Sequence, residues 1–191
     1  MKKIIGLMII ATGLVTSVAA QNTHFGLKAG LNLASLQNAD GADYDSRAGL
    51  HVGGLAHIHV STHFAVQPEV VFSMQGGDYD PANAKLKLNY INVPVLAQYM
   101  FNEGFRIQTG PQVGFLVSAK SKVGDVETDQ KDNFNSVDFA WTVGAGYLFP
   151  QGIGIDARYN IGISDITENN TNKFTNRVFQ VGLFYQFMHH K

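Results

Sequence analysis

Five charged residues stand in stretches that are otherwise apolar, small or uncharged, and they are the first candidates for chemistry: Lys28, Glu69, Arg106, Asp156 and Arg158. Around the last two, odd positions 153–163 read Ile, Ile, Ala, Tyr, Ile, Ile and even positions 154–164 read Gly, Asp, Arg, Asn, Gly, Ser. Successive side chains of a strand point to opposite faces, so the charges share one face. Because charges out of water must be paired, we predict an interior network of salt bridges and amides. A narrow ion path is the alternative.

Histidines offer a second kind of chemistry. His57 and His59 share one face of a stretch, with His63 and His24 at a similar level, so a metal site is one interpretation. Polar residues at the end of a strand are the interpretation we favour. His51 is the one strand histidine placed where a hydrolase or acyltransferase would need its base, and no Ser or Asp is its evident partner. We therefore expect no catalytic residue, no cofactor and no metal.

An acidic segment, Asp40 to Asp45, faintly resembles a calcium loop. Its spacing does not match the twelve-residue EF-hand pattern, so we interpret it as a solvated loop. Most of the 15 acidic residues lie in such polar segments. An acidic rim of this kind could meet divalent cations that bridge surface glycolipid, or a cationic partner.

The elements that must position these residues are eight alternating segments, in which one parity carries the large apolar side chains. They are 24–34, 50–60, 64–74, 85–101, 105–117, 137–149, 153–164 and 179–187. Short turns near 61–63, 102–104 and 150–152 alternate with four long polar loops. An even number of strands with short turns at one end and long loops at the other is typical of bacterial outer-membrane barrels.

The length of the segments favours the same fold. About nine to eleven residues are needed for a tilted strand to cross a bilayer, longer than most strands of globular proteins. The interior of an eight-stranded barrel is just wide enough for side chains, and the large apolar residues would overfill it. We therefore predict an all-β fold, an eight-stranded antiparallel up-and-down transmembrane β-barrel with its apolar face outward. A soluble ligand-binding barrel is the alternative.

Aromatic residues agree with this orientation. Six phenylalanines fall beside the short turns or at the ends of the barrel domain, as a girdle on the periplasmic side: Phe25, Phe64, Phe101, Phe105, Phe149 and Phe187. A thinner girdle is expected at the opposite level: Phe72, Tyr90, Phe139, Trp141 and Phe179.

Two irregularities interrupt the alternation. The apolar parity changes at Tyr90–Ile91, which predicts a β-bulge there. Pro68, Pro94 and Pro111 lie at similar heights in three consecutive segments. Because proline lacks a ladder donor, we expect bulges or a weakened ladder at these positions.

The first residues have the features of a targeting segment. Met1–Lys3 is basic, Ile4–Val18 is apolar, and small residues precede Gln21. We predict a cleaved signal peptide over 1–20 and an outer-membrane β-barrel domain over 21–191. The chain has no Cys, which excludes a disulfide framework and a thiolate metal site, and its net charge of −1 gives no nucleic-acid footprint.

Three stretches carry a resemblance to a known family: Phe25–Leu33, Val66–Ser73 and Tyr90–Leu96. They resemble the outer-membrane β-barrel domain family that includes PorT-like proteins and is related in form to the small OmpX and OmpA-type barrels. The resemblance implies the fold and an outer-membrane location and carries no catalytic residues. Likeness to PorT would imply a part in protein secretion. The tail Met188–Lys191 departs from barrels that end in an aromatic residue.

These patterns predict a structural or interaction protein of the Gram-negative outer membrane, without catalysis and with both termini periplasmic. A narrow pore or an accessory of transport or secretion is the second class, and a lipid-modifying enzyme the third. Expected partners are outer-membrane lipid and surface glycolipid, with loops 35–46 and 120–135 as candidate contacts for a protein. We expect a monomer and no nucleic acid.

Overall fold

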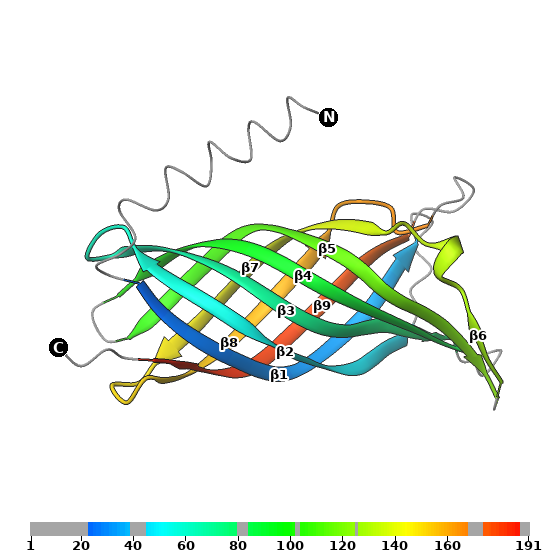
Figure 1. Ribbon diagram of the computed structural model, residues 1–191, viewed down its shortest axis with the longest axis horizontal. Coiled ribbons are helices and arrows are strands. Elements are labelled where there is room, and N and C mark those ends of the chain that lie inside the picture. Colours follow the sequence, from blue (N-terminus) through cyan, green and yellow to red (C-terminus); the bar gives the residue numbers. More distant parts are fainter. Residues whose placement is uncertain are drawn as a thin grey trace, which may run out of the picture.

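The computed structural model describes residues 23–38, 45–79, 84–101, 104–124, 126–167 and 174–187. These residues form one elongated barrel of antiparallel strands (Figure 1). The strands are β1 (Thr23–Asn38), β2 (Asp45–His59), β3 (Phe64–Tyr79), β4 (Ala84–Met100), β5 (Phe105–Val123), β6 (Val126–Asp129), β7 (Val137–Leu148), β8 (Ile153–Gly162) and β9 (Phe174–Gln186), with a 3-10 turn η2 (Lys131–Asn133) before β7. The predicted signal peptide, 1–20, lies outside the described residues.

Eight of the nine described strands close the barrel. Each pairs with its neighbours along the chain, β4 pairs with β5, β5 with β7, and β9 returns to β1. The ninth, β6, pairs only with the end of β5. We call the end with the connections β2–β3, β4–β5 and β7–β8 the turn end, and the opposite end the loop end. β1 begins and β9 ends at the turn end, where Phe187 N donates to Phe25 O at 2.8 Å. The predicted fold is confirmed.

The strands extend further toward the loop end than the sequence pattern indicates. Of the predicted loop 35–46, the described part belongs to β1 up to Asn38 and to β2 from Asp45. Of the predicted loop 120–135, β5 continues to Val123 and β6 follows. At 19 residues, β5 is far longer than the nine to eleven or so that a bilayer requires, so its end projects beyond the apolar wall.

The predicted bulge occurs at the predicted level, between Asn89 and Tyr90, but the extra residue belongs to the neighbouring strand. Even residues of β4 point inward along the whole strand, so its parity never changes. The irregularity is in β5: Asn89 pairs with Ser118 and Tyr90 with Leu116, which leaves Val117 as the extra residue. The apolar residues that suggested a parity change instead face an apolar part of the interior.

The prolines interrupt the ladder without shifting it. Pro68 pairs with Val95, and pairing of β3 with β4 resumes at Val71 in the same register. The same gap without a register shift follows Pro94 in the β4–β5 ladder. The expected weakened ladder is present and the bulge is not, because the missing N–H removes a hydrogen bond without adding a residue.

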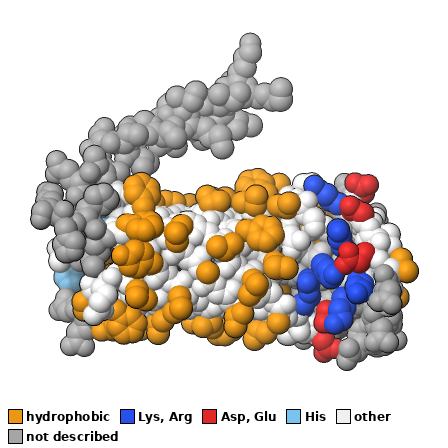
Figure 2. Space-filling model, turned by 60° about the horizontal axis from the view of Figure 1, so that its bottom comes forward, with side chains coloured by type: hydrophobic (Ala, Val, Ile, Leu, Met, Phe, Trp, Pro, Cys, Tyr) orange, Lys and Arg blue, Asp and Glu red, His pale blue; other side chains and the backbone are white. Residues whose placement is uncertain are grey.

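Apolar side chains cover the middle of the barrel on the face seen in Figure 2. Exposed large apolar residues come from each of the eight barrel strands. All six phenylalanines of the predicted turn-end girdle are exposed there, and tyrosines at 99, 147 and 185 stand between them in ring contact. In the opposite girdle Tyr90 is an error of the prediction, since it is 1% exposed inside the barrel. No helix among the described residues has the length and apolar character to cross a membrane.

Candidate functional site in the barrel lumen

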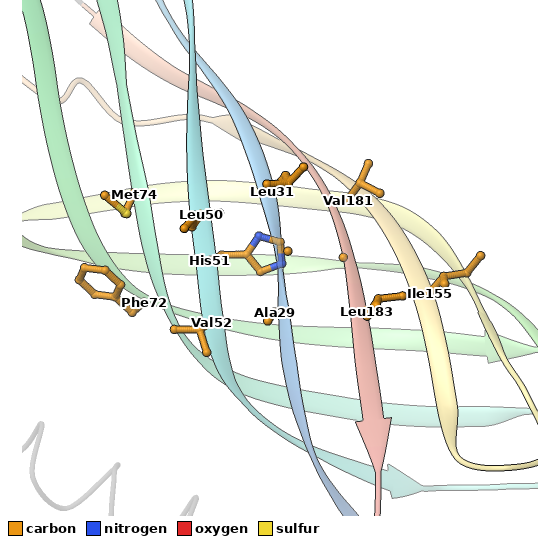
Figure 3. Close-up of a pocket in the computed structure, with 12 residues that line it drawn as sticks. Ala29, Leu31, Leu50, His51, Val52, Phe72, Met74, Ile155, Val181 and Leu183 are labelled. Atoms are coloured by element: carbon orange, nitrogen blue, oxygen red, sulfur yellow. The ribbon is translucent and has the colours of Figure 1, made fainter.

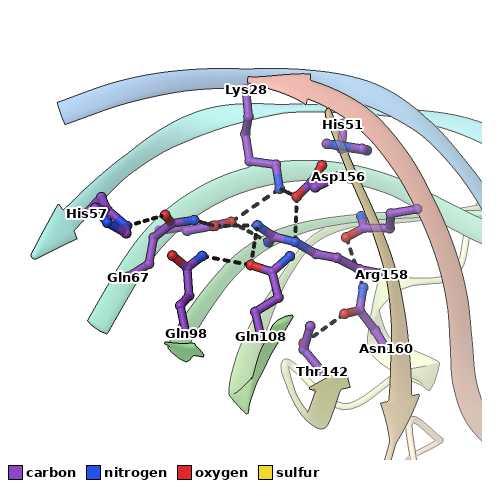
Figure 4. A network of polar contacts seen from close by, with 12 residues as sticks. Lys28, His51, His57, Gln67, Gln98, Gln108, Thr142, Asp156, Arg158 and Asn160 are labelled. Atoms are coloured by element: carbon purple, nitrogen blue, oxygen red, sulfur yellow. Dashed lines mark hydrogen bonds and ion pairs between the residues drawn. The ribbon is translucent and has the colours of Figure 1, made fainter. Parts of the chain in front are cut away.

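A layer of charged side chains crosses the lumen in the half nearer the turn end (Figure 4). Four of the five predicted interior charges lie in it, brought from β1, β3 and β8. Arg158 donates to both oxygens of Glu69 at 2.7 Å, a bidentate pair. Lys28 Nζ lies 3.1 Å from Asp156 Oδ2 and 3.5 Å from Glu69 Oε2. Arg158 Nε is 2.7 Å from Asp156 Oδ2, off the direction of its N–H. The layer thus balances two cations with two carboxylates.

The fifth predicted charge, Arg106, is not part of an ion pair among the described residues. It is 4% exposed, and its guanidinium lies over the ring of Phe184, 5.3 Å from the centroid. That ring in turn lies over Gly154, where a Cβ would come within 2.1 Å of it. Cation–π contact is favourable for a guanidinium removed from water. Arg106 is therefore placed by packing at the turn end of the lumen rather than by a carboxylate.

Glutamines connect the charged layer to the turn end. Gln67 donates to Glu69 Oε1 at 2.7 Å and accepts from the ring of His57 at 3.2 Å. Gln108 Oε1 accepts from Gln98 at 2.8 Å. The alternation of the sequence places these amides inward, but only the barrel brings them beside the charges.

A second layer, of neutral polar side chains, lies above the charges toward the loop end. Asn32 is its centre: its Oδ1 lies 2.8 Å from His51 Nδ1 and accepts from Gln180 Nε2 at 2.9 Å, while its Nδ2 donates to Ser73 Oγ at 3.0 Å. The hydrogen bonds continue from Gln180, which accepts from Asn160 Nδ2, to Thr142, whose hydroxyl donates to Asn160 Oδ1. Most of these groups satisfy one another, which is the condition for burying them.

A third layer, at the loop end, is apolar. Its core is Leu36, Leu88, Tyr90, Leu116, Ala119 and Ile166, with Phe134 and Phe174 packed against it. Ile166 and Phe134 come from the segments between strands, so described loop residues fold over the barrel mouth. The predicted polar interior is therefore wrong for this end, where side chains of β4 and β5 seal the lumen with hydrocarbon.

The family model for the outer membrane protein beta-barrel domain matches residues 19–168. The chain belongs to this family. The predicted family and the predicted location, the outer membrane of a Gram-negative bacterium, are confirmed. No curated protein sequence matches the chain.

Solved structures of outer-membrane barrels share the fold. Neisserial surface protein A aligns with a TM-score of 0.63 and 16% identity over 85% of this chain and 97% of that one. Ail, the attachment invasion locus protein of Yersinia pestis, aligns with a TM-score of 0.57 and 13% identity over 87% and 100%. Ail in complex with the heparin analogue sucrose octasulfate gives 0.54 and 14% over the same shares. At these identities the likeness shows the fold alone.

Three histidines of this family member, His24, His57 and His59, are packed side by side at the turn end. The ring of His59 lies 4.6 Å from that of His57 and 5.6 Å from that of His24, beside a hollow of about 420 Å³. His63 instead stacks on Tyr99. Among the residues that the structure describes, no group of three or more His, Cys, Asp or Glu is arranged to hold a metal ion. Asp40 and Asp43 of the faint calcium pattern lie outside the described residues.

An apolar hollow of about 770 Å³ lies in the outer wall over β1, β2 and β9 (Figure 3). Outward side chains such as Leu31, Leu50, Val52 and Leu183 line it. His51 lies beneath them and is 2% exposed, so it presents no base to the hollow. The hollow belongs to the surface that meets lipid in this family and offers no polar group to hold a solute.

Proposed function

We propose that this outer-membrane barrel is a closed structural or interaction protein that neither conducts ions nor catalyses a reaction. The observation that carries the proposal is the filling of the lumen by three successive layers, charged, amide and apolar. An eight-stranded barrel leaves room for little more than its own side chains, so each layer narrows the same path. The termini belong at the periplasmic end and the loop end faces outward.

Passage of an ion through this lumen has two separate obstacles. In the charged layer, an ion would have to displace one partner of a buried, bidentate pair, whose rupture leaves a charge uncompensated. In the apolar layer, it would have to shed its water among Leu88, Tyr90 and Leu116, where the Tyr90 hydroxyl alone cannot replace a hydration shell. A narrow pore, the second class of function, needs both of these layers to move.

Planar-bilayer recording tests the proposal. The full chain, refolded and shown to be folded by heat-modifiable gel migration, should give no steady current after insertion. A steady, ion-selective conductance would replace the proposal by the pore. For the enzyme class, the glycolipid of a deletion strain should be unchanged in acyl-chain number and phosphate content, and a reproducible change that the restored gene reverses would contradict the absence of catalysis.

The orientation is tested separately by labelling. The chain contains no Cys, so Lys120→Cys introduces a single thiol at the loop end. A maleimide that cannot cross the outer membrane should label this variant on intact cells. Labelling only after the cells are opened would reverse the orientation without affecting the conductance result.

A further inference from the structure

Two pairs of lysines face each other across β4 and β5 at the loop end. Lys85 pairs with Lys122 and Lys87 with Lys120. Figure 2 shows the resulting group of basic side chains beside the apolar band, with acidic side chains around it. Like charges directly opposite each other destabilise a ladder. Carboxylates on the flanking strands face three of the lysines: Asp78 of β3 faces Lys85, and Glu127 and Asp129 of β6 face Lys122 and Lys120.

The bulge at Val117 puts the four lysines on one face. Before the bulge, the even residues of β5 point inward, as Arg106 does. After it, Ala119 is buried and Lys120 points outward with a side chain that is 50% exposed. Without the extra residue, Lys120 and Lys122 would point into the apolar layer, because a shift of one residue exchanges the faces.

The acidic neighbours leave part of this charge free. Glu127 of β6 accepts a hydrogen bond from Lys87, which lowers the pKa of the carboxyl, and lies 3.6 Å from Lys120. Asp78 of β3 is 3.8 Å from Lys85, whose side chain is 59% exposed. Lys122 is in no ion pair among the described residues. The four lysines thus face three carboxylates, Asp78, Glu127 and Asp129, so one positive charge is in excess.

The height of the lysines matches the headgroup layer. Ile91 is an exposed apolar residue of β4, and Lys87 lies four residues nearer the loop end. At roughly 3.3 Å per residue and a strand tilt near 40°, Lys87 stands about 10 Å above it. The interfacial region of a leaflet is roughly 5–8 Å thick, and lysine side chains reach several Å toward it. The lysines therefore border the plane of lipid phosphates.

We propose that Lys85, Lys87, Lys120 and Lys122 form a binding site for the phosphate groups of an outer-leaflet glycolipid. The inference rests on the proposed orientation of the barrel. A lipid is favoured over a soluble polyanion because the site continues into the apolar wall, where Ile91 and Phe115 are exposed below the lysines. One lipid molecule can place acyl chains on that wall and phosphates on the ammonium groups.

The test measures binding of bisphosphorylated lipid A to the full chain in phosphatidylcholine nanodiscs, by titration followed with native mass spectrometry. Lys85→Gln with Lys122→Gln should weaken binding about thirty-fold, since a lysine near an anionic surface contributes roughly a factor of five. Lys85→Arg with Lys122→Arg should keep the affinity. Lys131→Gln, an exposed lysine of η2 outside the site, is the control and should change little.

Further arms identify the source of the phosphate. Lipid A without its phosphates should bind no better to the parent chain than to the double Gln variant. Inositol hexakisphosphate, a soluble polyanion, should not compete at equal phosphate concentration. Equal affinities of the parent and the double Gln variant, both shown to be folded by heat-modifiable migration, would overturn the proposal, as would efficient competition by the soluble polyanion. Because both faces of a nanodisc are accessible, a reversed orientation would leave these affinities unchanged.

Discussion

At the scale of single residues, the lumen depends on partners that are buried together. Glu69 is 2% exposed and accepts three hydrogen bonds, two from Arg158 and one from Gln67. A carboxylate removed from water is stable only with such a set of donors. Close packing also constrains the lumen, because the ring of Phe184 occupies the space that a side chain at Gly154 would need.

Glu69→Gln removes the negative charge and leaves Arg158 with one carboxylate. Rupture of a buried pair typically costs about 3–5 kcal/mol, so the variant should unfold at a clearly lower denaturant concentration. The measurement is urea unfolding of the refolded barrel in lipid vesicles, followed by heat-modifiable migration. Glu127→Gln, which removes an exposed carboxylate that also pairs with lysine, should have little effect. An equal fall in the urea concentration of unfolding in the two variants would show that the buried pair stabilises the barrel no more than the exposed one.

Gly154→Ala tests the close approach of the ring. A Cβ at this position would come within 2.1 Å of Phe184, so the ring and the Arg106 side chain packed on it must move. Overpacking of this kind costs about 1–3 kcal/mol in the same unfolding experiment. Gly54→Ala is the matched control, since its Cβ would meet only Gly26 O at 3.8 Å. An unchanged Gly154→Ala variant would mean that the ring has an alternative position.

At the scale of elements, a single extra residue decides what β5 presents on each side. Val117 lets Leu116 and Ala119 both be buried, one on each side of the bulge. The apolar seal and the outward lysines therefore have one cause. β-Bulges are known to re-aim side chains, and here the residues that are re-aimed lie on the loop-end side of Val117.

Deletion of Val117 should exchange the faces of β5 beyond the bulge. In a Lys120→Cys background, a bulky water-soluble maleimide should label the thiol of the folded barrel rapidly. The deletion should slow labelling at least tenfold or prevent folding, because the residue at 120 would then point into the apolar layer. Labelling at the original rate, in a variant with heat-modifiable migration, would contradict the role given to the bulge.

At the scale of the whole molecule, the barrel has its polar residues inside and its apolar residues outside. The apolar side chains at the middle of the wall are exposed, while residues such as Lys28 and Glu69 are buried. This is the reverse of a soluble barrel, and it follows from the solvent: in lipid the apolar face needs no cover, and the strands must close so that no edge is left unpaired.

Trp141, the single tryptophan, reports this orientation. It lies on β7 with 43% of its surface exposed, so brominated acyl chains should quench more than about half of its emission, because such quenching requires contact at the wall. A Trp141→Phe, Tyr90→Trp variant moves the indole into the lumen and should be quenched little. Strong quenching of the inner tryptophan, or none of Trp141, would contradict the arrangement of faces.

The sequence by itself determined the strand number, the outward apolar face and the turn-end girdle of Phe25 and its five partners, because alternation with period two is local and each strand repeats it. It also placed the interior charges on the inward face. It could not give their partners: Arg158 and Glu69 are 89 positions apart, and Lys28 and Asp156 are 128 apart.

Only the tertiary structure decided the register between neighbours, and with it the points that the sequence pattern misjudged. A bulge in β5 cannot be told from a change of parity in β4 until the two strands are paired, so Tyr90 was expected on the lipid face and lies in the lumen. Arg106 of β5 rests on Phe184 of β9, a strand that is not its neighbour. The four lysines meet on one face because the bulge shifts the pairing of β5 with β4. Contacts between strands depend on the stagger of the closed barrel, which no single segment encodes.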